Sequence, residues 1–123
     1  MSAPHVDEFG RLVVNSLRDE AIDFFDGLAV GRWRSPQTSS LQSEMASFTD
    51  AQRDIVRRCV IKSLDVGIHS FLFNLSELHD RFHKIDVTVE EQSVIDASDG
   101  LHGESFGDDG WIRRFGKHSE GRD

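Results

Sequence analysis

The stretch TDAQRDIVRRCVIKSLDVGIHSFLFNLSELHDRF, residues 49–82, decides the fold, because it predicts one helix that is very long for this chain. Its apolar residues recur at alternating steps of three and four, which is typical of one face of an amphipathic helix. They are Ile61, Leu64, Ile68, Phe71, Leu75, Leu78 and Phe82, flanked by Val56, Val60, Leu72 and Phe73. Thr49 and Gln52 have the spacing of a capping box, which predicts that the helix begins at Asp50.

The length of this helix raises a question of size. Unbroken from Asp50 to Phe82, it would span about 50 Å at about 1.5 Å per residue. A compact chain of this length has a radius of gyration of only about 14 Å. Either the helix breaks near Gly67, or its excess length packs against a second copy of the chain. We expect one long helix over about 50–80 and keep a homodimer as an open alternative.

A second run of helical spacing comes earlier and predicts a helix over about 7–29. Its apolar residues are Phe9, Val13, Leu17, Ala21, Phe24 and Leu28, with Val14, Ile22 and Phe25 beside them. The other side of this helix carries the polar residues Arg11, Asn15, Arg18, Asp19 and Asp23. After it, Ser35 and Pro36 predict a turn, and the spacing of Leu41 and Met45 fits one short helical turn.

The hydrophobic period changes to two after residue 83, where Ile85, Val87 and Val89 share one side of an extended segment. We therefore expect an antiparallel hairpin over about 84–97, which packs on the helices or pairs with a third strand near 111–115. Helices followed by a short antiparallel sheet make an α+β fold. The length of 123 residues predicts a single domain over 1–123, and residues 116–123 are expected to be a frayed tail.

The net charge of −8 disfavours nucleic acid and anionic membranes as partners and favours a cationic protein partner. The acids concentrate between residues 86 and 109, where the chain has no Lys or Arg. They are Asp86, Glu90, Glu91, Asp96, Asp99, Glu104, Asp108 and Asp109. This segment is the first candidate for a partner-binding surface.

Targeting and redox signals are few. The N-terminal residues have neither a basic region nor the apolar run of a signal peptide, and no segment has the length of apolar residues that a membrane span needs. The single cysteine, Cys59, excludes an internal disulfide and is expected to be a small buried hydrophobe. We therefore expect a cytoplasmic protein.

The stretch DGLHGESFGDDGW, residues 99–111, is the leading candidate site, because it combines four glycines with four acids, a histidine and two aromatics. Its candidate ligand- or partner-binding residues are Asp99, His102, Glu104, Asp108, Asp109 and Trp111. The carboxylates are suited to a hard cation, and a histidine beside a glutamate is suited to acid–base work. The spacing matches neither a calcium loop nor a phosphate loop, so a solvated connection is the alternative and no metal or cofactor is identified.

Three weaker candidates carry structural alternatives. His79 and His83, four residues apart, suit a transition metal if Asp80 or His102 adds a ligand, but cations also suit a helix C-terminus. The bases of the second helix's first turns, Arg53, Arg57, Arg58 and Lys62, are expected to form an ion-paired face. Trp33 and Trp111 are expected to fold over the core, with an exposed binding hot spot as the alternative for each.

Two functions follow from these patterns. The first is a protein-binding module, such as an immunity- or antitoxin-like inhibitor, that masks a cationic partner with the surface of residues 86–109. The alternative is an enzyme or a small-ligand or metal-binding protein that uses residues 99–111, whose side chains would then converge on one concave pocket. No nucleophile elbow, HExxH, CxxC or GxGxxG motif occurs, so no catalytic residue is assigned.

Overall fold

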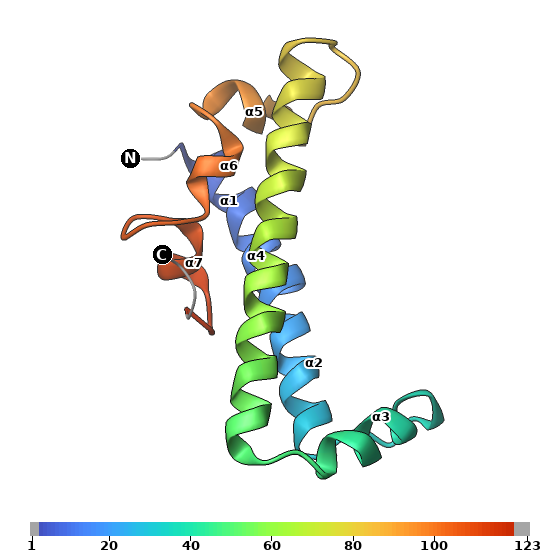
Figure 1. The fold of residues 1–123 in the computed structure, drawn as a ribbon. Coiled ribbons are helices and arrows are strands. Elements are labelled where there is room, and N and C mark those ends of the chain that lie inside the picture. The colour runs from blue at the N-terminus through green and yellow to red at the C-terminus, as the bar shows by residue number, and fades with distance from the viewer. Residues whose placement is uncertain (1–2, 120–123) are drawn as a thin grey trace.

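The computed structural model describes residues 3–119, and their regular structure is almost entirely helical (Figure 1). The first long helical segment consists of α1 (Pro4–Leu12), a π-helical segment η1 (Val13–Asp19) and α2 (Glu20–Ala29). It starts earlier than the expected residue 7 because a proline suits the first helical position. Its end at Ala29 confirms the expected one.

The second long helix, α4 (Asp50–Asp80), confirms the expectation over 50–80 and runs antiparallel to the first segment (Figure 1). The capping box is present: the Gln52 amide donates to Thr49 Oγ1 at 3.1 Å, and the Thr49 amide donates to Gln52 Oε1 at 2.8 Å. The helix passes through Gly67 without a break. The first of the two alternatives, a broken helix, is therefore excluded.

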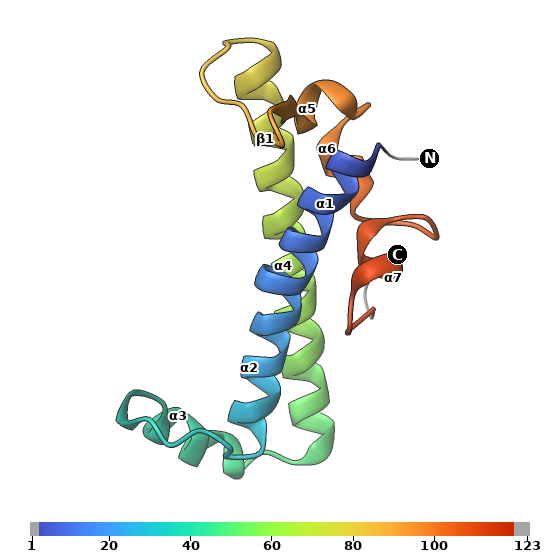
Figure 2. The same cartoon turned by 180° about the vertical axis from the view of Figure 1, so that it is seen from behind.

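The connection between the long helices contains a further helix, α3 (Pro36–Ala46), which is longer than the single turn expected there. The side chain of Ser35 caps it by accepting from the Gln37 amide, and Pro36 occupies its first position. The helix lies across the far end of the pair, away from the C-terminal residues (Figure 2).

The expected sheet is much smaller than predicted. Strands β1 (Thr88–Val89) and β2 (Gln92–Ser93) form an antiparallel hairpin of two residues each, within the expected 84–97. The next residues do not extend the second strand, because Ser93 caps the short helix α5 (Val94–Ala97) by accepting from the Asp96 amide. The fold is therefore essentially all-α with a minor hairpin rather than α+β.

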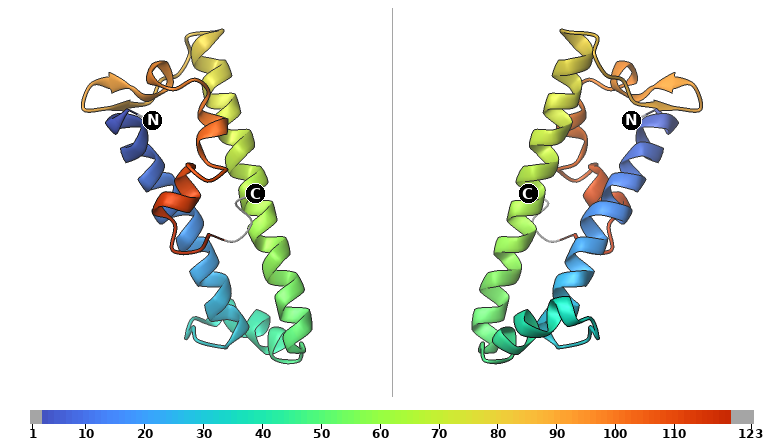
Figure 3. Two further views of the ribbon diagram at one scale, coloured as in Figure 1. Left: turned by 90° about the vertical axis from the view of Figure 1, so that its left-hand side faces the viewer. Right: turned by 90° about the vertical axis from the view of Figure 1, so that its right-hand side faces the viewer.

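The expected third strand near 111–115 is wrong, because these residues form the helix α7 (Trp111–Phe115). Trp111 and Ile112 are both buried and Phe115 is half-buried. This spacing of one and three residues fits a helical turn against a core, whereas a strand would alternate. With α5 and α6 (Leu101–Glu104), α7 forms a C-terminal layer over one side of the helix pair (Figure 3).

The core lies between this C-terminal layer, the N-terminal half of the first helical segment and the C-terminal half of α4. Its buried members are Val6, Val14, Ile68, Leu72, Leu75, Val94, Ile95, Leu101, Trp111 and Ile112. Trp111 is fully buried and makes an edge-to-face contact with Phe9 at 6.1 Å between ring centroids. Gly10 lies against the indole, where a Cβ atom would have no room.

The expected apolar stripes of the long helices are only partly buried. Leu17 is 48% exposed, Phe24 47% and Phe71 58%. The polar side of the first helix is instead partly covered, since Arg18 and Asp19 are buried. Among the described residues, no helix is long and apolar enough to span a membrane.

Candidate functional site

The six candidate residues of the 99–111 stretch do not gather in one place. Trp111 is part of the core. Asp99 and Asp108 are exposed to solvent. His102 turns toward α4, where its ring packs against His69 at 5.3 Å and Phe73 at 5.2 Å between centroids.

Glu104 and Asp109 do share a pocket, of about 510 Å³, which is also lined by Asp7, Phe106 and Arg114. Arg114 donates to both carboxylate oxygens of Asp7, at 2.8 and 3.1 Å, and its Nε donates to the Asp109 carbonyl at 2.8 Å. The hydrogen bonds to Asp7 raise the pKa of Arg114. The Glu104 carboxylate accepts from the Ser98 hydroxyl at 2.6 Å. The pocket is thus polar and joins the C-terminal layer to α1.

The histidine pair of the second helix is separated by the helix end. The helix stops at Asp80, and His83 follows it with a φ of 52°. His79 instead hydrogen-bonds Asp96 at 2.8 Å and the Ile85 carbonyl at 3.0 Å. These bonds, led by the one to Asp96, raise the pKa of His79 above its usual 6.5. Both ring nitrogens are therefore used in joining α4 to the segments that follow it.

Three of the four bases in the first turns of α4, namely Arg53, Arg57 and Arg58, are ion-paired, as expected. Arg53 pairs with Asp50 at 3.0 Å and Arg58 with Asp54 at 3.0 Å, while Arg57 reaches across to the first helix. Cys59 is exposed rather than buried, because it lies at an open groove on the side of α4 that the C-terminal residues do not cover.

Trp33 folds back as a partial cover over the end of α2. Its ring stacks on Phe24 at 5.6 Å between centroids, and its Nε1 donates to the Phe24 carbonyl at 2.9 Å. The contact is close enough that Gly27 beneath it has no room for a Cβ atom. Trp33 therefore folds back on α2, as expected, but it covers the half-exposed Phe24 rather than the core.

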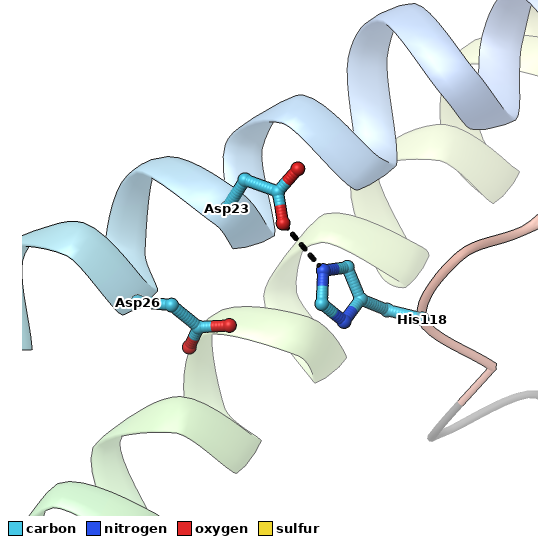
Figure 4. Close-up of side chains that lie close together, drawn as sticks. All are labelled: Asp23, Asp26 and His118. Atoms are coloured by element: carbon cyan, nitrogen blue, oxygen red, sulfur yellow. Dashed lines mark hydrogen bonds and ion pairs between the residues drawn. The ribbon is translucent and has the colours of Figure 1, made fainter.

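The sequence analysis missed a cluster around the C-terminal residues, which it expected to be frayed. The Asp19 carboxylate accepts from the amides of Lys117 at 2.9 Å and His118 at 3.2 Å. Asp23 accepts from the side chain of Lys117 at 3.0 Å and from that of His118 at 2.7 Å. The bond between Asp23 and His118 is drawn in Figure 4. Those bonds, first the one from His118, lower the pKa of Asp23 below its usual 3.8. Residues 120–123 lie outside the described part.

His118 lies between an acid and a base. Its Nε2 is 2.7 Å from Asp23 Oδ1, and its Nδ1 is 3.3 Å from a guanidinium nitrogen of Arg57. A guanidinium only donates, so Nδ1 accepts and Nε2 carries the proton that it donates to Asp23. Arg57 also binds Asp26 through two hydrogen bonds, at 2.8 and 3.2 Å. Both nitrogens of the imidazole thus connect the C-terminal segment to the two long helices.

Asp23, Asp26 and His118 also have the geometry of metal ligands, since their ligand atoms lie within 4.8 Å of one another. Arg57 and Lys117 already supply positive charge to these carboxylates. A metal ion would have to displace both side chains. We therefore interpret the cluster as a set of structural contacts that hold the C-terminal segment against the two long helices.

A buried ion pair between the two long helices lies next to these contacts. Arg18 Nε lies 2.6 Å from Asp65 Oδ1, and a second guanidinium nitrogen lies 3.2 Å from Oδ2. The side chains are 0% and 4% exposed, and Arg18 also donates to the His118 carbonyl. The π-helical segment at this point changes the angle between neighbouring residues, so Arg18 and Asp19 both face inward.

On the side of the helix pair away from the C-terminal layer, an apolar groove of about 590 Å³ lies between the first helix and α4. Its lining residues are Leu17, Val56, Cys59, Val60, Ser63, Leu64, Gly67, Ile68 and Phe71. The sequence held a signal for this groove, because the apolar stripes of both helices are wider than one contact between two helices needs.

Comparison with models of protein families, with characterised proteins and with solved structures finds no match to this chain.

Proposed function

We propose that the chain is a protein-binding module that recognises a cationic partner through the exposed carboxylates of its C-terminal half. Of the eight acids between residues 86 and 109, three form hydrogen bonds with other side chains: Asp86 accepts from Ser93, Asp96 binds His79, and Glu104 accepts from Ser98. The other five are exposed, and one of them, Asp108, also pairs with Arg113 at 3.7 Å. They are Glu90, Glu91, Asp99, Asp108 and Asp109. These five form the proposed acidic surface.

The observation that supports this proposal most strongly is the position of the five carboxylates on turns and links. Glu90 and Glu91 occupy the hairpin turn with positive φ, and Asp99 lies in the link between α5 and α6. Asp108 and Asp109 lie between α6 and α7. A surface of one sign accelerates encounter with a partner of the opposite sign and makes the association depend on salt.

The test compares two triple variants with the same change in net charge. Glu90→Gln, Glu91→Gln and Asp99→Asn remove three charges from the acidic surface. Glu20→Gln, Glu44→Gln and Asp50→Asn remove three exposed charges elsewhere. The probe is an octalysine peptide titrated by calorimetry at low salt.

We expect the first variant to bind the peptide about tenfold more weakly than wild type, since each exposed ion pair contributes about 0.2–1 kcal/mol. The control should lose less than about twofold, because its charges lie beyond a Debye length of about 10 Å. Equal losses would contradict the proposal, because they would show that only the net charge matters.

A second candidate function is the binding of a small cation in the pocket of Glu104 and Asp109, whose volume of about 510 Å³ fits a small ligand. Magnesium and calcium chloride titrations, followed by thermal unfolding, test it. Binding would raise the Tm of wild type but not that of Asp109→Asn. An unchanged Tm in wild type at millimolar metal would exclude a divalent cation.

A further inference from the structure

The apolar groove is a feature of the surface that the proposed function leaves unused. It is separate from the acidic surface, because α6 contacts α4 through His69 and Phe73, whereas Gly67 and Phe71 line the groove. A step of two residues turns a helix by about 200°, so the two sets face opposite ways. The two ribbon views of Figure 3 show the C-terminal layer on one side of the helix pair only.

The exposed apolar area of this face is close to what a stable interface requires. Leu17, Phe24 and Phe71 are each about half exposed, and Phe24 follows Leu17 by seven residues and therefore shares its side of the first helix. With the half-buried Val56, Val60 and Leu64, the face offers about 400 Å² of apolar surface per copy, taking about 200 Å² for a whole phenylalanine. A standard interface of about 800 Å² per partner contains about 450–500 Å² of apolar surface.

The part of this face that α4 contributes from Ser63 onward is electrically neutral, although the chain carries a net charge of −8. Between Ser63 and Ser76, the only charged side chain is Asp65, which is 3% exposed and paired with Arg18. Two copies of this acidic chain can therefore approach along this part of α4 without placing carboxylates against each other. A cationic partner would gain no ion pair here.

Gly67 lies near the middle of α4 and on the groove. A glycine inside an exposed helix costs about 1 kcal/mol relative to alanine. A Cβ atom added here would meet nothing within 4 Å in the single chain, so packing within the monomer does not require glycine. A glycine at this position would suit the close approach of a second helix backbone, since glycine lets two helix axes come nearer than larger residues allow.

From these four observations we propose that the groove is occupied by a second copy of this chain. The two α4 helices pack antiparallel about a two-fold axis near Gly67, and each contributes the same surface. Phe71, one turn after the glycine, then lies against Ser63, one turn before it in the other copy. In this arrangement the exposed Phe71 side chain of each copy packs into the space that the small Ser63 side chain leaves on the other copy.

The test uses sedimentation equilibrium of the intact chain and three variants in the micromolar range. Phe71→Asp places a charge at the centre of the proposed interface. Phe82→Asp is the matched control, because Phe82 is 56% exposed but lies beyond the end of α4 and outside the groove. Gly67→Gln blocks close approach while it improves the helix propensity of the monomer.

We expect wild type to sediment at twice 13.9 kDa and Phe82→Asp to do the same. Phe71→Asp should weaken the dimer by about 30-fold or more, as expected for a central aromatic. Gly67→Gln should also be monomeric, with a far-UV circular dichroism spectrum at least as helical as that of wild type. This second variant decides the question if Phe71→Asp fails to fold.

A monomeric wild type would overturn the proposal, and so would equal weakening by Phe71→Asp and Phe82→Asp or a dimer unaffected by Gly67→Gln. Salt separates this proposal from the acidic surface. Dimerisation should hold or strengthen as sodium chloride is added, because screening reduces the repulsion between two copies. Binding of octalysine should weaken under the same conditions, so either proposal can fail while the other stands.

Discussion

The buried pair of Arg18 and Asp65 provides the sharpest prediction about stability. Both side chains are almost completely buried, and two hydrogen bonds join them. Replacement of one member leaves the other charge buried without its counter-ion, which typically costs about 3–5 kcal/mol. Asp65→Leu should lower the free energy of unfolding by about 3 kcal/mol, the lower end of this range. The reason is that Arg18 still donates to the His118 carbonyl.

Removal of both charges should cost much less than removal of either. In the double variant Arg18→Met with Asp65→Leu, apolar side chains of similar length fill the space and no isolated charge remains. The cost should be about 1–2 kcal/mol, mainly for the donor that the His118 carbonyl loses. The double variant should therefore be more stable than either single variant.

Urea unfolding followed by far-UV circular dichroism measures the free energy of unfolding for the four proteins of this cycle. A domain of this size has a total stability of about 5–15 kcal/mol, so a loss of 3 kcal/mol moves the midpoint visibly. The reasoning is wrong if Asp65→Leu costs less than about 1 kcal/mol. It is also wrong if the two single losses simply add in the double variant.

Three further changes test other parts of the structure. Gly10→Ala should lower the free energy of unfolding by about 1–3 kcal/mol, because the new methyl group meets the Trp111 indole. This loss should exceed the gain from the better helix propensity of alanine. An unchanged or raised midpoint in urea would contradict that packing. Thr49→Ala should lower the free energy of unfolding by about 1 kcal/mol, because it removes the capping box. Thr49→Ser, which keeps a hydroxyl at this position, should retain most of that stability in the same assay. The raised pKa of His79 means that its bonds stabilise the fold below its usual pKa of 6.5 and that this stability is lost as pH rises through the higher folded value. The stability difference between wild type and His79→Gln should therefore be larger at about pH 5.5 than at about pH 8.5, and an opposite trend would show that His79 is not held as a cation by Asp96.

The long helices could be predicted from sequence because their signals are local. The spacing of Ile61, Ile68 and Leu75 and the capping box at Thr49 act within a few turns of one helix, and they located α4 almost to the residue. The same reasoning found the hairpin, whose turn lies at Glu90 and Glu91. It placed a third strand at residues 111–115, because five residues that include three apolar ones do not by themselves distinguish a strand from one helical turn.

The candidate site was predicted less well, because a site depends on residues that are distant in sequence. Glu104 and Asp109 meet Asp7 and Arg114 only after α1 packs against the C-terminal layer. Trp111 was a candidate for binding because it is aromatic and follows a glycine-rich stretch, but it fills the core beside Gly10. No local pattern reports which side of a helix another segment will cover.

The sequence by itself determined two long amphipathic helices, their order and the surplus of exposed acids after residue 86, because periodicity, capping and composition act over short distances along the chain. Only the tertiary structure decided which apolar residues are buried. The C-terminal segment covers the polar side that holds Arg18 and Asp19 and satisfies those groups with the backbone of Lys117 and His118. Each helix has two sides and this segment covers only one, so Leu17 and Phe71 remain exposed in the single chain.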